Sequence, residues 1–241
     1  MFRRLIHGLT QILYPKVCLS CKKKLGAEAK DGFICSQCRG KIKKNLPPFC
    51  ISCGRQLEKR WFAKNICPSC QKKRLHFDRA FSPFVYDGII KELIHKFKYG
   101  GREHLGLPLS ELMTDFIRDY RLPMDCIDCI VPIPLHNTRL REREFNQAQI
   151  LGRQIALEFK IDILNEAIVR TRHTKTQTDL EIRERAANVK GSFRVKDPEA
   201  VKGKNVLVID DVLTTGATSS EVAAALKGAG ANIVFVLTLA N

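Results

Sequence analysis

The chain has 241 residues, 44% of them hydrophobic, and a formal net charge of +16. This composition excludes an intrinsically disordered chain, and no stretch reaches the ~18 apolar residues of a membrane-spanning helix. The charge is uneven, because residues 1–78 hold 18 Lys and Arg against 4 Asp and Glu, whereas the rest of the chain holds 23 against 21. We therefore expect two units, a basic head over residues 1–78 and a nearly neutral body over residues 79–241.

The first predicted element is an amphipathic helix at the start of the chain. Before Pro15, six apolar residues recur at helical spacing and share one face: Phe2, Leu5, Ile6, Leu9, Ile12 and Leu13. The stretch has neither the uninterrupted apolar core nor the cleavage site of a secretion signal. We expect this helix to pack on the rest of the chain rather than on a membrane.

Four C-x-x-C pairs follow, and their spacing repeats. The inner cysteines of the first and second pairs are separated by 13 residues, as are those of the third and fourth. Two such pairs complete a tetrahedral shell for Zn²⁺. We expect up to two structural zinc ions on Cys18, Cys21, Cys35, Cys38, Cys50, Cys53, Cys67 and Cys70. Pairing within each repeat is favoured, and interleaved pairing stays open.

Disulfides are the competing interpretation of these cysteines. They would need a secretory route, so zinc-bound thiolates in a reducing cytoplasm are favoured. A fifth pair, Cys126 and Cys129, lies in an apolar run that predicts a strand. Residues three apart on a strand face opposite sides, so we expect two ordinary buried cysteines there.

The basic head predicts a nucleic-acid surface. Eight thiolates with two Zn²⁺ would subtract four charges from the head and leave about +10, which suits contact with a phosphate backbone. Trp61 lies among Lys59, Arg60 and Lys64, and an aromatic ring between cations can stack on exposed bases. The alternative, that Trp61 fills the small core of the second ribbon, is favoured.

Strands and helices alternate in the body. A strand with a turn is predicted at 79–88, further strands at 127–134, 166–172, 191–195, 205–210 and 232–240, and helices at 89–101, 104–120, 145–159, 179–189 and 219–230. The apolar strands predict an α/β fold in which helices cover both faces of a parallel sheet. Ligands of such sheets bind beyond the carboxyl ends of the strands.

One of those strand ends carries two adjacent acids, Asp210 and Asp211, followed by Thr214, Thr215, Gly216, Ala217 and Thr218. A turn of small and hydroxylated residues before a helix presents N–H groups to an anion, and glycine permits close approach. The spacing matches neither a P-loop nor a dinucleotide fingerprint. Because carboxylates repel phosphate, the acids are expected to serve the vicinal hydroxyls of a ribose, or Mg²⁺ bound to them. The stretch predicts a site for a phosphorylated ribose.

The motifs of the chain also resemble those of a known family. Residues 206–218, "VLVIDDVLTTGAT", match the motif by which type I phosphoribosyltransferases bind phosphoribosyl pyrophosphate (PRPP). The whole arrangement resembles the ComF (competence protein F) family, to which GntX-like proteins also belong. After the cysteine ribbons come, in the family's order, "LIHKFKYGG", "VPIPLH", "RLREREFNQAQ", "RTRHTKTQTDL" and "RERAANVKGSF". One departure is Glu144, where the family usually has Gly, and an acid there weakens an anion role for Arg143.

The resemblance implies a type I phosphoribosyltransferase (Rossmann-like) body preceded by a double zinc ribbon. Asp210 and Asp211 would be the catalytic pair that holds the ribose hydroxyls. The full PRPP-binding set would be Asp210, Asp211, Val212, Thr214, Thr215, Gly216, Ala217 and Thr218. Pyrophosphate with Mg²⁺ would face the turn formed by Pro134, Leu135 and His136. A catalytic loop over 171–177 would add Arg172 and Lys175, and a solvated loop is the alternative for these two cations.

The resemblance also implies a PRPP-binding protein that acts in competence, DNA uptake and the processing of single-stranded DNA, and the cysteines predict that it is cytoplasmic. We expect a pentosyl transferase, although no residue pattern identifies the acceptor. The alternatives are a nucleic-acid-binding protein whose PRPP site is regulatory or vestigial, and a scaffold whose ribbons dock a helicase-like uptake component.

Overall fold

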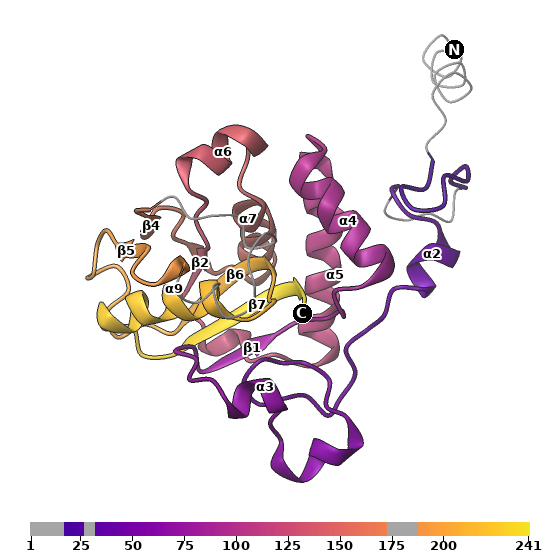
Figure 1. Cartoon of the computed structure of the whole chain (residues 1–241). Helices are drawn as coiled ribbons and strands as arrows, with labels where there is room; N and C mark the ends of the chain where they lie inside the picture. Colours follow the sequence, from indigo (N-terminus) through magenta and orange to yellow (C-terminus); the bar gives the residue numbers. More distant parts are fainter. Residues whose placement is uncertain (1–16, 27–31, 173–187) are drawn as a thin grey trace.

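A computed structural model describes residues 17–26, 32–172 and 188–241 (Figure 1). The predicted helices at 2–13 and 179–189 therefore lie wholly or largely outside the described residues. The helices of the described parts are α2 (Ser36–Gly40), α3 (Pro68–Gln71), α4 (Gly88–Tyr99), α5 (Gly106–Asp119), α6 (Asn137–Arg143), α7 (Gln147–Phe159) and α9 (Ala217–Gly228). Short 3₁₀ turns are η1 (Lys59–Lys64), η2 (Glu103–Leu105) and η3 (Met124–Cys126).

The body is built on a five-stranded sheet in the order β1-β7-β6-β2-β3, and every neighbouring pair is parallel. Its strands are β1 (Arg79–Phe81), β2 (Cys129–Pro132), β3 (Asp162–Ile163), β6 (Val206–Val212) and β7 (Val234–Ala240). The predicted parallel sheet is thus confirmed, with the short strand β3 added at its edge. The strands predicted at 166–172 and 191–195 are β4 (Ile168–Arg170) and β5 (Phe193–Val195), but they pair with each other, antiparallel, in a separate sheet.

Alternation along β6 divides the core between the two faces of the sheet. Leu207 and Ile209 pack in a cluster with apolar residues of α4, α5 and α7. Val206 and Val208 pack instead with apolar residues of α9. Figure 1 shows α4 and α5 on one side of the sheet and α9 on the other. A strand buried on both faces explains why its sequence is continuously apolar.

The two cysteine ribbons rest on different parts of the body. The first ribbon (residues 18–38) packs Phe33 and Ile34 into the cluster of α4 and α5. The second ribbon (residues 50–70) has a small core of its own, in which Trp61 packs partly buried against Leu57 and the cysteines. This agrees with the favoured interpretation of Trp61. Figure 1 shows α2 beside α4 and α5, and α3 below β1.

The fifth cysteine pair differs from its prediction in one member. Cys129 is buried at the start of β2, as expected. Cys126 is exposed in η3 and donates to the carbonyl of Pro123, so the prediction of two buried strand cysteines is wrong for it. The strand begins later than its apolar run suggested. Among the described helices, none combines the length and apolar character needed to cross a membrane.

Gly54 joins the second ribbon closely to β1. Its φ is +69°, and a Cβ built on it would lie 2.3 Å from the carbonyl oxygen of Ala80. Gly203 has a similar φ of +72° with no atom within 4 Å of its Cβ position.

We predict that Gly54→Ala lowers the unfolding free energy by about 3 kcal/mol, and Gly203→Ala by about 1 kcal/mol, because only the change at Gly54 adds a steric clash to the backbone strain. Urea unfolding of both variants measures this, and equal losses would contradict the close approach.

Candidate functional site

A cleft of about 480 Å³ opens at the carboxyl ends of β2 and β6. This is where ligands bind in parallel sheets. One wall is the end of β6 with the loop after it, and the others come from α4, α6, the start of α7 and β4. The residues that carry its chemistry are Lys91, Lys98, Tyr99, Pro134, Leu135, His136, Arg139, Arg143, Gln147, Arg170, Asp210, Asp211, Val212, Thr214 and Thr218.

The acid pair stands at the end of β6. Asp211 shares the face of Leu207 and Ile209, so it points toward α4, where its Oδ1 lies 2.8 Å from Nζ of Lys98. Asp210 accepts a hydrogen bond from the backbone N–H of Asp211 at 2.8 Å. Burial would lower the pKa of Lys98, but the charge of Asp211 outweighs it and the pKa is raised. The ion pair therefore holds Lys98 charged in a buried position.

The environment of Asp210 favours its neutral form, whereas that of Lys98 favours the charged form. Burial, and then the neighbouring charge of Asp211, raise its pKa to about 7. A hydroxyl that donates to Asp210 would stabilise its charged form, as hydrogen bonds to a carboxylate do. The pair is therefore suited to a ligand that offers hydroxyl donors or a cation, and unsuited to direct contact with phosphate.

The loop after β6 turns directly into α9. Leu213 is buried and its N–H donates to the carbonyl of Ala240 at 2.9 Å. Gly216 starts the helix at a φ of +78°, a left-handed conformation that favours glycine. The first N–H groups of a helix lack acceptors within it and carry the positive end of its dipole. Thr214 and Thr218 stand on the cleft wall next to the acids, so the anion cradle and the acid pair open into one space.

Cations gather on the facing walls of the cleft. Arg143 donates to Oε1 of Gln147 at 3.1 Å and to the hydroxyl of Tyr99 at 3.2 Å. Burial lowers the pKa of Arg170, and repulsion from Arg139 and Arg143 adds to this effect although Asp210 opposes it. With Lys91 and Lys98, five cations line the cleft against two acids. This excess of positive charge suits a polyanionic ligand.

Some of the residues that the sequence predicted for the site line this cleft, and other lining residues were not predicted. Pro134, Leu135 and His136 line it, and Nδ1 of His136 caps α6 by accepting from the N–H of Thr138 at 3.3 Å. Arg172 is not among the lining residues and donates to the carbonyl of Lys190 at 2.6 Å, while Lys175 lies outside the described residues. Sequence reasoning gave no role to Lys98, Tyr99, Arg139, Gln147 or Arg170. All but Arg170 stand in the blocks "LIHKFKYGG" and "RLREREFNQAQ", which were the available signal.

Glu144 has a backbone role rather than a place in the cleft. It ends α6 with a φ of +67°, where glycine is the preferred residue. Its side chain is exposed and lies outside the cleft lining, whereas the neighbouring Arg143 is part of that lining. The glycine that the family usually has here is thus explained by backbone geometry, and the acid does not oppose Arg143 across the cleft.

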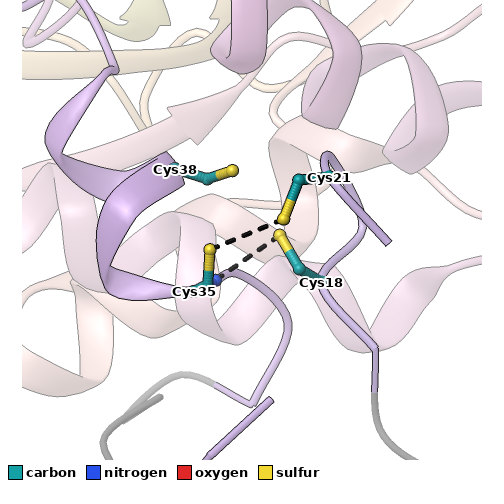
Figure 2. A group of neighbouring side chains, drawn as sticks. All are labelled: Cys18, Cys21, Cys35 and Cys38. Carbon is teal, nitrogen blue, oxygen red and sulfur yellow. Dashed lines mark hydrogen bonds between the residues drawn. The ribbon is translucent and has the colours of Figure 1, made fainter. Parts of the chain in front are cut away.

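Each ribbon gathers four cysteine sulfurs. Cys18, Cys21, Cys35 and Cys38 form one group, shown converging in Figure 2, and Cys50, Cys53, Cys67 and Cys70 form the other. Within each group all sulfurs lie within 4.8 Å of one another, which confirms pairing within each repeat. The sulfurs of Cys21 and Cys35 are 3.7 Å apart, as are those of Cys53 and Cys67. Tetrahedral Zn²⁺ with bonds of about 2.3 Å requires a sulfur separation of about 3.8 Å, so both groups fit the metal.

Backbone donors support the thiolates in the same way in both ribbons. The N–H of Cys35 donates to the sulfur of Cys18 at 3.5 Å, and the N–H of Cys67 to that of Cys50 at 3.4 Å. Burial alone would raise the pKa of Cys18, but backbone donors led by Cys35 lower it to about 6. Such donors orient metal ligands and stabilise their charged form. The repeat in the sequence is therefore a repeat in metal-site geometry.

A parallel α/β body with this acid pair and loop, preceded by two four-cysteine ribbons, defines a zinc-ribbon protein of the phosphoribosyltransferase fold. Family models agree, because a double zinc ribbon domain matches residues 9–73 and a phosphoribosyl transferase domain matches residues 146–241. The chain is 30% identical to competence protein F of Haemophilus influenzae and 31% identical to DNA utilization protein YhgH of Escherichia coli, in both cases over 93% of this chain and 96% of the relative. The chain belongs to the competence protein F family.

Two more distant likenesses complete the comparison. Competence protein ComFC of Streptococcus pneumoniae is 25% identical, over 79% of this chain and 86% of that one. Among solved structures, a glutamine PRPP amidotransferase from B. subtilis is 19% identical, over 58% of this chain and 26% of that one, with a TM-score of 0.35. A likeness this low has no bearing on function.

We predict that Lys98→Met destabilises the ligand-free protein by about 3 kcal/mol at pH 8, because it leaves Asp211 charged and unpaired beside Asp210. The charge of Lys98 opposes the rise in the pKa of Asp210, so without it that pKa lies further above the unfolded value. The variant's penalty is therefore small near pH 5, where Asp210 is protonated, and grows as pH rises through the folded pKa of Asp210. Lys91→Met, which also removes a cleft cation of α4, is the control and should cost little. A penalty that did not change between pH 5 and pH 8 would contradict this account.

Proposed function

We propose that this protein binds PRPP together with Mg²⁺ in the cleft, as a phosphoribosyltransferase-type enzyme of competence and DNA utilization. The observation that supports it most directly is the arrangement of one cleft, which has a hydroxyl-accepting acid pair beside an anion-binding loop and a group of cations opposite. PRPP has ribose hydroxyls, a 5-phosphate and a pyrophosphate, which are complementary to the acid pair, the loop and the cations respectively.

The roles follow from the chemistry of each wall. Asp210 and Asp211 accept hydrogen bonds from the ribose hydroxyls. The 5-phosphate is held by the loop and helix start that follow, through Val212, Thr214, Thr215, Gly216, Ala217 and Thr218. The turn at Pro134 to His136, with Arg139 and Arg143, faces the pyrophosphate. Mg²⁺ bound with PRPP would neutralise the charge of the departing pyrophosphate. Arg172 and Lys175 stay a prediction for a loop that closes over it.

The proposed reaction needs positioning more than covalent help. As pyrophosphate leaves, the ribosyl carbon becomes cationic, and an acceptor attacks from the opposite face. The acids hold the sugar while the cations stabilise the leaving group. Two aromatic rings, those of Tyr86 and Tyr99, also line the cleft and favour a planar acceptor such as a base.

The names of the relatives and the charge of residues 1–78 support a role with DNA. Competence protein F and DNA utilization protein are the names of relatives that align over nearly the whole chain. Single-stranded DNA is the proposed partner, and its backbone would lie on the head over residues 1–78, ahead of a catalytic body over 79–241. In the second ribbon, Arg60 and Lys64 lie 5.7 Å and 5.8 Å from the ring centre of Trp61. With Lys59, they form the proposed contact.

The positive charge of residues 1–78 by itself favours a second function, the binding of nucleic acid without catalysis. The head carries net +14 whether or not catalysis occurs, so the protein could bind nucleic acid while PRPP acts as a regulator or its site is vestigial. In a related form, the ribbons are a scaffold that docks a helicase-like uptake component. Zinc-bound thiols support a place in the reducing cytoplasm for all of these functions.

We predict that PRPP with Mg²⁺ binds the full chain in a calorimetric titration and that Asp210→Asn weakens binding about 100-fold, because a charge-assisted hydrogen bond to a ribose hydroxyl is lost. Asp162→Asn, which removes an exposed acid of β3, is the matched control and should bind normally. Pyrophosphate release with a nucleobase or with DNA, abolished by Asp211→Asn, would identify the protein as an enzyme. If PRPP binds and no acceptor gives release, the regulatory role replaces the catalytic one.

We predict that single-stranded DNA binds with a steep salt dependence. Neutralising Lys59, Arg60 and Lys64 to Gln should reduce the slope of log affinity against log salt by about 2, because three phosphate contacts are lost. Neutralising three exposed lysines of the body makes the same charge change and should leave the slope unaltered: Lys160, Lys196 and Lys202. An equal effect of both triple variants would exclude a specific contact at the second ribbon.

A further inference from the structure

The chain that leaves the second ribbon packs directly behind the TTGAT loop (residues 214–218). A Cβ built on Gly216 would lie 3.3 Å from Cδ2 of Leu75 and 3.7 Å from the ring of Phe77. Leu75 packs against two cores at once, that of the second ribbon and that of the α9 face of the sheet. The left-handed turn at Gly216 is therefore supported from behind by residues that the ribbon positions.

Hydrogen bonds tie the same segment to the start of α9. The backbone N–H of His76 donates to Oγ of Ser220 at 3.1 Å, and Nδ1 of His76 lies 3.4 Å from the same oxygen. Ser220 belongs to the first turn of α9, and its own N–H donates to the carbonyl of Gly216 at 2.8 Å. The backbone after the ribbon, the helix start and the loop thus form one hydrogen-bonded unit.

The second ribbon is also fixed to the sheet behind the loop. Asn241, at the end of β7, donates through Nδ2 to the carbonyl of Cys53 at 3.1 Å. Ala80 of β1 donates to the carbonyl of Ser52 at 2.7 Å. A cavity of about 380 Å³ is lined both by ribbon residues, Cys53, Cys67 and Cys70, and by loop residues, Leu213, Thr214, Thr215 and Gly216. The metal shell and the proposed phosphate-binding loop therefore border the same cavity.

The described part of the first ribbon makes no contact with the TTGAT loop. Its described part meets α4 and α5 instead, where Nζ of Lys96 donates to the carbonyl of Leu19 at 2.5 Å and Arg39 lies 3.7 Å from Asp115. Of its described residues, none lines the 380 Å³ cavity or the 480 Å³ cleft. The two ribbons repeat each other in sequence and metal geometry, yet among their described residues only those of the second ribbon reach the loop.

We infer that the second zinc site sets the shape of the TTGAT loop, so that affinity for PRPP depends on the zinc ion of the second ribbon and not on that of the first. Zn²⁺ supplies folding energy that a ribbon this small cannot obtain from its core. Without it, Leu75 and His76 lose their anchor, and the loop N–H groups are no longer preorganised for an anion. The inference rests on the proposed PRPP site, and makes Leu75 and His76 positioning residues for it.

The two ribbons supply their own matched variants. Cys70→Ser and Cys38→Ser each remove the fourth ligand of one shell, and each should reduce the zinc content of the full chain from two ions to one. We expect Cys70→Ser to weaken PRPP–Mg²⁺ binding more than about tenfold, or about 1.4 kcal/mol, and Cys38→Ser to leave it within about twofold. Hydrogen exchange of the amides of residues 213–222 should become faster in Cys70→Ser alone. Equal effects of the two variants on binding and exchange would overturn the inference.

A third variant separates the contact from the folding of the ribbon. Leu75→Ala keeps all eight ligands, and should retain two zinc ions while exchange at residues 213–222 accelerates and PRPP–Mg²⁺ binding weakens about fivefold. If Cys70→Ser unfolds the body by circular dichroism, this variant decides the matter, and unchanged exchange in it would overturn the inference. If the unmodified protein fails to bind PRPP, the proposed function is wrong, and the exchange of Cys70→Ser and Leu75→Ala still tests the coupling.

Discussion

The ion pair between Lys98 and Asp211 is the interaction on which the cleft depends. Two adjacent carboxylates at the end of a buried strand repel each other, and burial raises the free energy of both charges. Lys98 lies in the last turn of α4, and its Nζ is 2.8 Å from Oδ1 of Asp211, so it neutralises that charge. The pairing leaves Asp210 as the acid with the raised pKa. An otherwise unfavourable charge arrangement is thereby held ready for a ligand with hydroxyl groups.

The sequence predicted part of that arrangement. The residues that it predicted differ physically from those that it did not. The acid pair, the loop and the cysteine shells are local patterns, in which neighbours along the chain carry the chemistry. Lys98 and Arg170 reach the same cleft from α4 and β4, and only tertiary packing brings them to β6. No spacing rule connects residues so far apart.

The errors at the level of the fold have the same origin. The two-residue strand β3 is too short for a periodic signal, and α6 has no buried residue to give it one. The strands β4 and β5 were predicted, but their antiparallel pairing with each other in a separate sheet was not, because the apolar pattern of a short strand does not identify its partner. At Cys126 an apolar run extended beyond the strand it contains. Strong periodicity predicted α4, α5, α7 and α9, because each packs an apolar face on the sheet or on a neighbouring helix.

Leu75 and His76 connect the second ribbon to the loop after β6, where the sugar phosphate is proposed to bind. A crystal structure of the full chain with PRPP, Mg²⁺ and Zn²⁺ tests the central claim of this account most directly. The account predicts the ribose hydroxyls within hydrogen-bonding distance of Asp210 and Asp211 and the 5-phosphate on the N–H groups of residues 214–218. A 5-phosphate bound against the cations of α6, with the ribose hydroxyls turned away from both acids, would contradict it.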